Sequence, residues 1–261
     1  MVRRPIQINT EDYPEKILSY LEDAKLYDSS CSPFAKVIFI DKNEGFYLKT
    51  AEKGTLKREA DMTGFFAAKG LSSEVVEYIS LDRDYMLTRK ISGEDCTYYR
   101  YTEQPEKLCD TLATLLRKLH GESFEGCPVP DHTAVYLDTV EKNYKNKCFD
   151  LSYLDSSLGK LNADEVYKYV FERKHLLKSD TLLHGDYCLP NILLDDFVFS
   201  GFIDVGNGGI GDRHVDLFWG AWTLNFNLKT DKYRNRFFDA YGKNLVDLEI
   251  IKLISAIECF G

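Results

Sequence analysis

The chain has 261 residues, 44% of them hydrophobic, and a formal net charge of -9. That length and apolar content are sufficient for a sizeable core divided between two lobes. The acidic balance and the lack of a Lys/Arg cluster exclude a nucleic-acid partner. No apolar run is long enough to span a membrane, and the first residues lack the apolar core of a signal peptide. We therefore expect a cytoplasmic protein that is a monomer or a weak dimer.

The first third of the sequence predicts a small antiparallel sheet with one helix. Two runs of β-branched and apolar residues flank a turn, a helical period follows and ends at Gly70, and two more strand-like runs come after it. The glycine is a natural helix C-cap. The predicted strands are 36–40, 46–50, 74–79 and 85–89, and the predicted helix is 56–69.

Beyond residue 94 the periodicity is mainly helical. Pro105 begins an amphipathic helix with a leucine-rich face that extends to about His120. Two short strands, 192–194 and 199–204, interrupt the later helices, which are predicted at 164–177, 215–227, 231–241 and 246–259. The pattern predicts an α+β fold of two lobes, with a β-rich N-terminal lobe and a helical C-terminal lobe, which suits an enzyme with a cleft. Residues 1–90 would form the first lobe, 91–261 the second, and 89–94 the hinge.

A lysine and a glutamate in the first lobe suit a phosphate site. Lys49 follows the apolar residues 46–48, and Glu59 comes ten residues later on the predicted helix. A lysine that grips the α- and β-phosphates of ATP must itself be held by a counter-charge. The apolar neighbours of Lys49 favour this interpretation over a solvated surface pair. The serine-rich loop 29–34 can cradle a phosphate with hydroxyl and N–H groups, although an ordinary polar loop explains it equally well.

The strongest functional signal is the segment 184–191, His-Gly-Asp-Tyr-Cys-Leu-Pro-Asn, followed by Asp204 after an apolar strand. The spacing between Asp186 and Asn191 is that of a kinase catalytic loop. Asp186 would orient and deprotonate the acceptor hydroxyl, while Asn191 and Asp204 would hold a magnesium ion. ATP and water would complete the magnesium coordination. We expect His184 to be a structural residue, because Asp186 already supplies the base.

A hydrolase is the main alternative for an Asp–His pair in a loop. It would need a nucleophile on a strained turn, and the sequence has no G-x-S-x-G motif. Cys188 lies inside the loop, but nothing in the sequence marks it as an activated thiol. Phosphoryl transfer is therefore the favoured chemistry.

The segments 184–191, 199–206 and 211–217 closely resemble the aminoglycoside 3'-phosphotransferase family. Looser matches to the same family extend over nearly the whole chain. They are Ser32-Pro33, Leu48-Lys49, Arg58-Glu59, the segment 116–120 and Cys127-Pro128.

This resemblance implies a two-lobed fold similar to protein kinases, ATP and Mg²⁺ as cofactors, and phosphorylation of a sugar hydroxyl on an aminoglycoside antibiotic. It assigns the catalytic base to Asp186 and the magnesium to Asn191 and Asp204. It also implies that Arg213 lines the acceptor site. The implied nucleotide contacts are Ser32, Lys49, Glu59 and the backbone of Arg89 and Ile91.

The sequence departs from the family pattern mainly on the acceptor side. Family members place several carboxylates around the amines of the sugar, because a desolvated ammonium needs a counter-charge. Trp222-Thr223 stands where an Arg-Asp pair is frequent in the family. Near the C-terminus the chain keeps Glu258 but lacks the Asp that usually precedes it. Ile38 stands where an aromatic residue often stacks on adenine. The remaining acceptor carboxylates are Asp150, Asp155 and Glu258.

Three hypotheses follow. The leading one is an ATP-dependent phosphotransferase of the aminoglycoside 3' type that confers resistance. The second keeps the fold and the reaction but changes the acceptor to another sugar, a choline-like amine or an amino-alcohol. The third is a nucleotide-binding protein without turnover, against which the intact set of Lys49, Asp186, Asn191 and Asp204 argues.

Overall fold

The computed structural model describes residues 4–261, which form two compact units. Unit 1 contains the described residues up to Glu94 together with Leu193–Gly206, and unit 2 contains Asp95–Ile192 together with Asn207–Gly261. The division differs from the predicted one at residue 90 because a later segment, Leu193–Gly206, returns to unit 1.

Unit 1 is built on a six-stranded sheet in the order β1-β2-β3-β4-β6-β5, in which every neighbouring pair is antiparallel. The central strands are rich in β-branched and aromatic residues, which pack well on a pleated surface. The strands are β1 (Arg4–Pro5), β2 (Lys25–Asp28), β3 (Ala35–Asp41), β4 (Phe46–Glu52), β5 (Val75–Ser80) and β6 (Arg83–Arg89).

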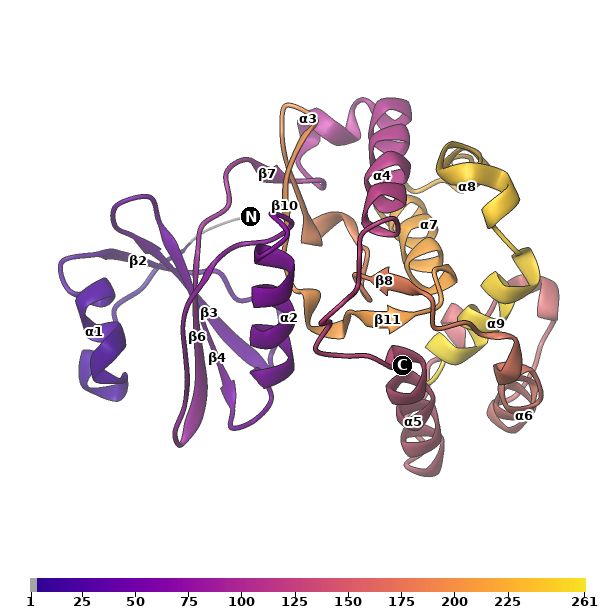
Figure 1. Ribbon diagram of the computed structural model, residues 1–261, viewed down its shortest axis with the longest axis horizontal. Coiled ribbons are helices and arrows are strands. Elements are labelled where there is room, and N and C mark those ends of the chain that lie inside the picture. The colour runs from indigo at the N-terminus through magenta and orange to yellow at the C-terminus, as the bar shows by residue number, and fades with distance from the viewer. Residues whose placement is uncertain (1–3) are drawn as a thin grey trace. The chain divides into compact units, whose positions relative to one another are not determined.

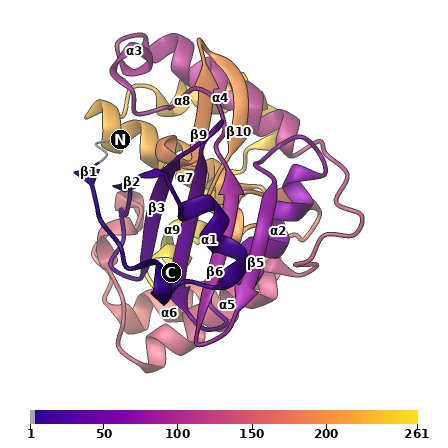
Figure 2. The same cartoon turned by 90° about the vertical axis from the view of Figure 1, so that its left-hand side faces the viewer.

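Two helices cover the two faces of this sheet, where the sequence predicted one (Figure 1). Helix α1 (Glu15–Leu21) buries Ile17 and Leu21 against one face. Helix α2 (Lys57–Ala67) packs Ala60 against the other face. Figure 2 shows the α1 side of the sheet towards the viewer. The first helix was missed because it is only seven residues long and has no side-chain N-cap.

The returning segment of unit 1 is a hairpin of β9 (Ile192–Asp195) and β10 (Val198–Phe202), and β9 also pairs with β7 (Glu94–Asp95). Phe202 ties the hairpin to the rest of the unit: its N–H donates to the carbonyl of Leu71 at 2.8 Å, and its carbonyl accepts from Ser72 Oγ at 2.7 Å. The hairpin places Asp204 two residues beyond the end of β10.

Unit 2 is mainly helical, as predicted. Helix α4 packs against α8, and α9 packs against both α6 and α7. Strands β8 (Thr181–Leu183) and β11 (Gly209–Gly211) form a small antiparallel pair. The helices are α3 (Tyr99–Thr102), α4 (Pro105–Leu119), α5 (His132–Lys145), α6 (Ala163–Arg173), α7 (His214–Leu228), α8 (Arg234–Gly242) and α9 (Leu248–Glu258).

Short 3₁₀ turns connect these elements. They include η2 (Leu151–Tyr153) and η5 (Leu189–Asn191), which ends the segment 184–191 and begins three residues after Asp186. All seven cysteines are free thiols, as expected from their scattered positions. Within residues 4–261, no helix has the length and apolar character required to cross a membrane.

Candidate active site

Unit 1 brings together three of the predicted site residues. Lys49 Nζ lies 2.8 Å from both carboxylate oxygens of Glu59 and 2.9 Å from Oδ1 of Asp204. Lys49 is on β4, Glu59 is in the first turn of α2, and Asp204 follows β10. The predicted Lys–Glu pair is therefore formed, and it is partly buried, with 19% and 13% of the two side chains exposed.

The two carboxylates keep the lysine charged. Burial lowers the pKa of the Lys49 ammonium, but the attraction of Asp204 and Glu59 outweighs it and the pKa is raised overall. The side chain of Asp204 is 52% exposed, and its backbone is in the left-handed region with φ 55°. The result is a fixed positive charge beside an accessible carboxylate, which suits the binding of a phosphate chain with a metal ion.

A buried aspartate on the neighbouring strand positions the helix that carries Glu59. Asp84 on β6 is fully buried, and its Oδ2 accepts from the N–H of Leu56 at 2.9 Å, where α2 begins. Hydrogen bonds from Ser80 and from the backbone hold the pKa of Asp84 below its usual value despite the opposing effect of burial. Because Leu56 cannot cap a helix with its own side chain, Asp84 supplies the missing acceptor.

The prediction that Ile38 occupies a position for stacking on adenine is wrong for this structure. Ile38 is fully buried and packs with Ile17 and Leu21 on the α1 face of the sheet. Side chains alternate along a strand, and Val37 is the residue of β3 directly paired with Lys49. Val37 therefore shares the face of Lys49, whereas Ile38 points to the opposite face.

The other predicted nucleotide contacts lie at the ends of unit 1 strands. Ser32 is exposed in the loop between β2 and β3, where its Oγ accepts from the N–H of Phe34 at 3.2 Å. The N–H of Arg89 donates to the carbonyl of Glu74 at 3.1 Å, so it already has a partner within the sheet. Ile91 is half-buried just beyond β6. The roles of Ser32, Arg89 and Ile91 towards a nucleotide stay predictions.

Unit 2 contains the catalytic loop in a well-defined conformation. Asn191 Nδ2 donates to the carbonyl of Asp186 at 3.0 Å and to its Oδ2 at 2.8 Å. The amide therefore fixes the orientation of the carboxylate, and the metal contact predicted for its oxygen stays a prediction. Gly185 has φ 82°, and a Cβ there would lie 2.0 Å from the carbonyl oxygen of Asn207. Only glycine fits this position of the loop.

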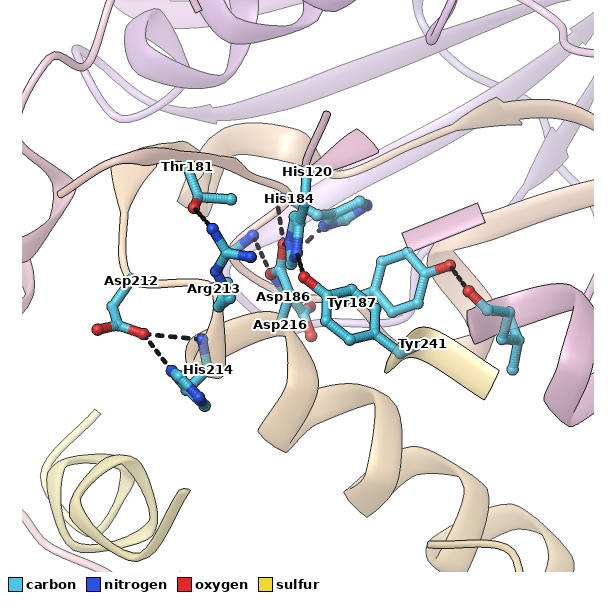
Figure 3. A network of polar contacts seen from close by, with 12 residues as sticks. His120, Thr181, His184, Asp186, Tyr187, Asp212, Arg213, His214, Asp216 and Tyr241 are labelled. Carbon is cyan, nitrogen blue, oxygen red and sulfur yellow. Dashed lines mark hydrogen bonds and ion pairs between the residues drawn. The ribbon is translucent and has the colours of Figure 1, made fainter. Parts of the chain in front are cut away.

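A second aspartate, which is not among the predicted site residues, anchors the backbone of the same loop. Asp216, at the start of α7, is fully buried and accepts from the backbone N–H groups of His184 and Gly185, both at 2.8 Å (Figure 3). His120 Nε2 lies 3.1 Å from the same carboxylate, and its Nδ1 lies 2.8 Å from the hydroxyl of Tyr241. In the sequence, Asp216 lies at the start of a predicted helix and within the segment 211–217 that resembles the family, but neither signal indicates that it anchors the loop.

The charges of this network follow from its hydrogen bonds. Burial raises the pKa of Asp216, but the hydrogen bond from His120 and the backbone N–H donors outweigh burial and lower it. Burial also lowers the pKa of His120, so its ring is neutral near pH 7. A neutral ring that donates from Nε2 to the carboxylate must accept at Nδ1, which fits the hydroxyl of Tyr241 as donor.

His184 is structural, as expected. It is fully buried, and its Nδ1 accepts from the N–H of Asp186 at 3.3 Å. The loop is held at two further points, where Tyr187 donates to the carbonyl of Leu112 at 2.8 Å and Leu189 N–H donates to Thr223 Oγ1 at 3.1 Å. The backbone around Asp186 is thus fixed from α4 and α7.

On the predicted acceptor side, Glu258 is buried and firmly held. Its Oε1 accepts from the indole Nε1 of Trp219 at 2.8 Å and from the hydroxyl of Tyr136. Burial, with a smaller contribution from the charge of Asp186, raises the pKa of Glu258 to about 7. This carboxylate therefore senses the charge of Asp186 and ionises only near neutral pH.

Two predicted acceptor residues are engaged elsewhere. Asp155 Oδ1 accepts from the N–H of Ser157 at 2.9 Å, and its Oδ2 lies 3.4 Å from Arg234 Nη2. The charge of Asp155 is therefore partly balanced within the fold, and its contact with an acceptor ammonium stays a prediction. The Nη2 of Arg213 lies 3.3 Å from Oγ1 of Thr181, at the start of β8 (Figure 3). The role of Arg213 towards an acceptor stays a prediction.

The residues predicted to hold magnesium have the right donor atoms. Asp204 offers an exposed carboxylate and Asn191 an amide oxygen, and Mg²⁺ prefers such hard oxygen ligands. The two residues belong to different units, so their joint coordination of one ion stays a prediction. Among residues 4–261 there is no cluster of three or more His, Cys, Asp or Glu side chains suited to a metal.

Solved structures place this fold in a known class. The chain aligns with a crystal structure of aminoglycoside-3'-phosphotransferase of type VIII with a TM-score of 0.74 and 23% identity, covering 96% of both chains. It also aligns with the aminoglycoside phosphotransferase APH(3'')-Id of Streptomyces rimosus ATCC10970 in complex with ADP and streptomycin. That match has a TM-score of 0.67 and 19% identity, and covers 86% of this chain and 90% of the other. The fold and the loop define a phosphotransferase of the protein-kinase-like class.

Sequence comparison gives the family. Residues 33–253 match the sequence model of the Phosphotransferase enzyme family. The chain is 49% identical over 259 residues to a probable aminoglycoside 3'-phosphotransferase of Lactococcus lactis subsp. lactis (strain IL1403), with 99% of this chain and 98% of the relative covered. The chain belongs to the Phosphotransferase enzyme family, in the group of the aminoglycoside 3'-phosphotransferases.

Proposed function

We propose that the protein transfers the γ-phosphate of ATP to a hydroxyl of an aminoglycoside, in the 3' manner of its relatives, and thereby gives resistance. The observation that carries this proposal is the catalytic loop, in which Asn191 orients the Asp186 carboxylate and Asp216 fixes the backbone beneath it. Relatives named for this activity, one of them 49% identical, support the choice of acceptor.

In this proposal the predicted site residues bind ATP and its metal ion. Lys49, held by Glu59, would bind the α- and β-phosphates, and Ser32 and the backbone of Arg89 and Ile91 would contact the rest of the nucleotide. Asn191 and Asp204 would hold Mg²⁺, which when bound neutralises charge on the phosphates. Aminoglycoside-phosphotransferase structures with ADP or with AMP-PNP support the use of ATP.

Asp186 would accept the proton of the acceptor hydroxyl as that oxygen attacks the γ-phosphate. The hydrogen bond from the amide of Asn191 to one carboxylate oxygen of Asp186 supports this role, because it orients the carboxylate. Holding a base and a hydroxyl in line with the phosphate removes much of the entropy cost of the reaction. A cytoplasmic location, where ATP is abundant, belongs to the same proposal.

A second candidate keeps the reaction but changes the acceptor to another hydroxylated metabolite. The ion pair of Asp155 with Arg234 favours it, because this pairing removes one of the few carboxylates available for a polycationic drug. Measuring ADP release with a panel of sugars, amino-alcohols and aminoglycosides would separate the two candidates.

The direct test is phosphorylation of kanamycin or neomycin by the purified protein with Mg-ATP. We expect a product heavier by one phosphate from the wild type and none from Asp186→Asn. Thermal melts of both proteins check that the variant is folded. The absence of a phosphorylated product from any aminoglycoside, with either ATP or GTP, would exclude the aminoglycoside assignment.

A further inference from the structure

Four aromatic side chains of unit 2 lie together beside the catalytic loop. Trp219, Trp222 and Phe226 come from α7, and Tyr153 comes from η2. The ring centroids of Trp219 and Trp222 are 5.3 Å apart, and Tyr153 lies 5.7 and 5.9 Å from them. Phe226 stacks on Trp222 at 4.9 Å with an interplanar angle of 10°. We call these four residues the aromatic surface.

The aromatic surface is not part of the hydrophobic core. Phe218 and Leu224 on the same helix are buried, whereas Trp219, Trp222 and Tyr153 are only half-buried and Phe226 is 55% exposed. Trp219, Trp222 and Phe226 are spaced three and four residues apart, so they follow one side of α7. A group of large rings that remains in contact with water is typical of a binding surface.

This surface is continuous with the proposed acceptor side of the active site. Trp219 donates to Glu258, and Thr223, the residue after Trp222, accepts from the N–H of Leu189 in the catalytic loop. The pKa of Tyr153 is raised, chiefly by burial, and also by the charges of Glu258 and Asp186. Tyr153 therefore lies within electrostatic reach of the catalytic carboxylate.

The chemistry of the aromatic surface suits a cation bound to a sugar ring. The negative faces of Trp and Tyr attract ammonium groups, and their flat apolar bodies pack against the C–H faces of a sugar. Phe226 already has the ammonium of Lys229 at 4.3 Å from its ring centroid, so this group of rings tolerates a cation in contact. With Asp155 paired to Arg234, Glu258 and the exposed Asp150 are the carboxylates of the predicted acceptor side that remain for a positive charge.

We infer that the aromatic surface, together with Glu258, is the acceptor-binding surface of this enzyme. The acceptor that fits this surface is an amino sugar, with one ring and its ammonium groups packed against Trp222, Trp219 and Tyr153. In this mode of binding, aromatic faces replace most of the carboxylates that would otherwise surround the ammonium groups. This inference rests on the proposed function and names the residues that determine its acceptor specificity.

The chain offers a direct spectroscopic test, because its only two tryptophans are both in the aromatic surface. We expect kanamycin to change the tryptophan emission of the wild type without ATP, with a dissociation constant close to its KM. Asp186→Asn should show the same change, because it lacks turnover but keeps the surface. Emission unaffected at kanamycin concentrations that saturate turnover would overturn the inference.

Steady-state kinetics of matched variants provide a second test of the aromatic surface. Trp222→Ala should raise the KM for kanamycin about tenfold, equivalent to ~1.4 kcal/mol, and leave the KM for ATP unchanged. Trp222→Phe, which keeps an aromatic face, should recover most of the loss. Phe226→Ala should raise the KM for kanamycin, whereas Phe171→Ala, a matched phenylalanine that is 53% exposed on α6, should not.

The outcomes separate the two claims. Wild-type turnover of kanamycin with an unchanged KM in the Trp222 and Phe226 variants would leave the proposed function intact and refute this inference. A lack of wild-type turnover of any aminoglycoside, with ATP or GTP, would refute the proposed function, and the emission titration would then decide whether the surface binds an amino sugar. Tryptophan emission that depends on protein concentration without kanamycin would assign the surface to a second copy of the chain and also refute the inference.

Discussion

Asp216→Asn tests how the fold positions the catalytic loop. Asp216 accepts from the N–H groups of His184 and Gly185 and faces His120. An asparagine in the same place has one oxygen, so at least one of the two buried N–H groups loses its acceptor. An unsatisfied buried donor costs about 1–3 kcal/mol. We expect the free energy of unfolding to fall by that amount, a substantial part of the 5–15 kcal/mol typical of a folded domain.

The same change should lower activity beyond its effect on stability. Loss of the anchor lets the backbone that carries Asp186 shift, and a misplacement of about 1 Å can reduce the rate about 100-fold. We therefore expect kcat to fall about 10- to 100-fold at a temperature where the variant is fully folded. Urea unfolding gives the stability change, and steady-state kinetics with kanamycin gives kcat.

Asp212→Asn is a matched control. Asp212 is also buried, accepts from two backbone N–H groups, those of His214 and Lys178, and contacts a histidine ring, but it does not touch the catalytic loop. Asp212→Asn should therefore cost similar stability and leave kcat within about twofold. Equal losses of kcat in both folded variants, or none in Asp216→Asn, would refute the argument that Asp216 positions the loop.

Two further predictions concern charge. Glu59→Gln should lower kcat/KM for ATP about tenfold, which corresponds to a loss of ~1.4 kcal/mol of transition-state stabilisation. The reason is that Lys49 loses one of its two carboxylate partners. Unchanged steady-state kinetics with ATP would contradict this prediction. The raised pKa of Glu258, about 7, means that the folded protein binds a proton more tightly than the unfolded chain between pH 4.5 and 7. Stability contributed by this group therefore falls as pH rises through that window, by up to about 3 kcal/mol. Glu258→Gln should remove the difference in stability between about pH 5 and about pH 8 that this group contributes, as measured by thermal melts at both pH values. If the variant keeps the same difference as the wild type, Glu258 is not its source.

Local sequence patterns were sufficient to predict most elements of this fold. The strands around Lys49 and the helix that carries Glu59 were found because their apolar periodicity is strong and a glycine marks the helix end. The family resemblance and the kinase-like fold are confirmed by the comparisons. Helix α5 and strands β8 and β11 were missed, because the strands are three residues long and α5 has a weak apolar face.

Contacts between distant segments could not be predicted from spacing alone. The pairing of Asp155 with Arg234 joins residues 79 positions apart, and Asp216 reaches the loop 31 residues before it. Ile38 was assigned to the wrong face because the register of β3 against β4, not the sequence of β3, decides which residue faces Lys49. Each of these depends on tertiary packing.

The central claim is that Asp186 serves as the base of an ATP-dependent transfer to an aminoglycoside. The most direct measurement is the mass of kanamycin after incubation with Mg-ATP and either the wild type or Asp186→Asn. The account predicts a phosphorylated product with the wild type and a loss of orders of magnitude in its rate of formation with the variant, at an unchanged melting temperature. Equal rates from the two proteins, or no phosphorylated aminoglycoside from the wild type, would contradict it.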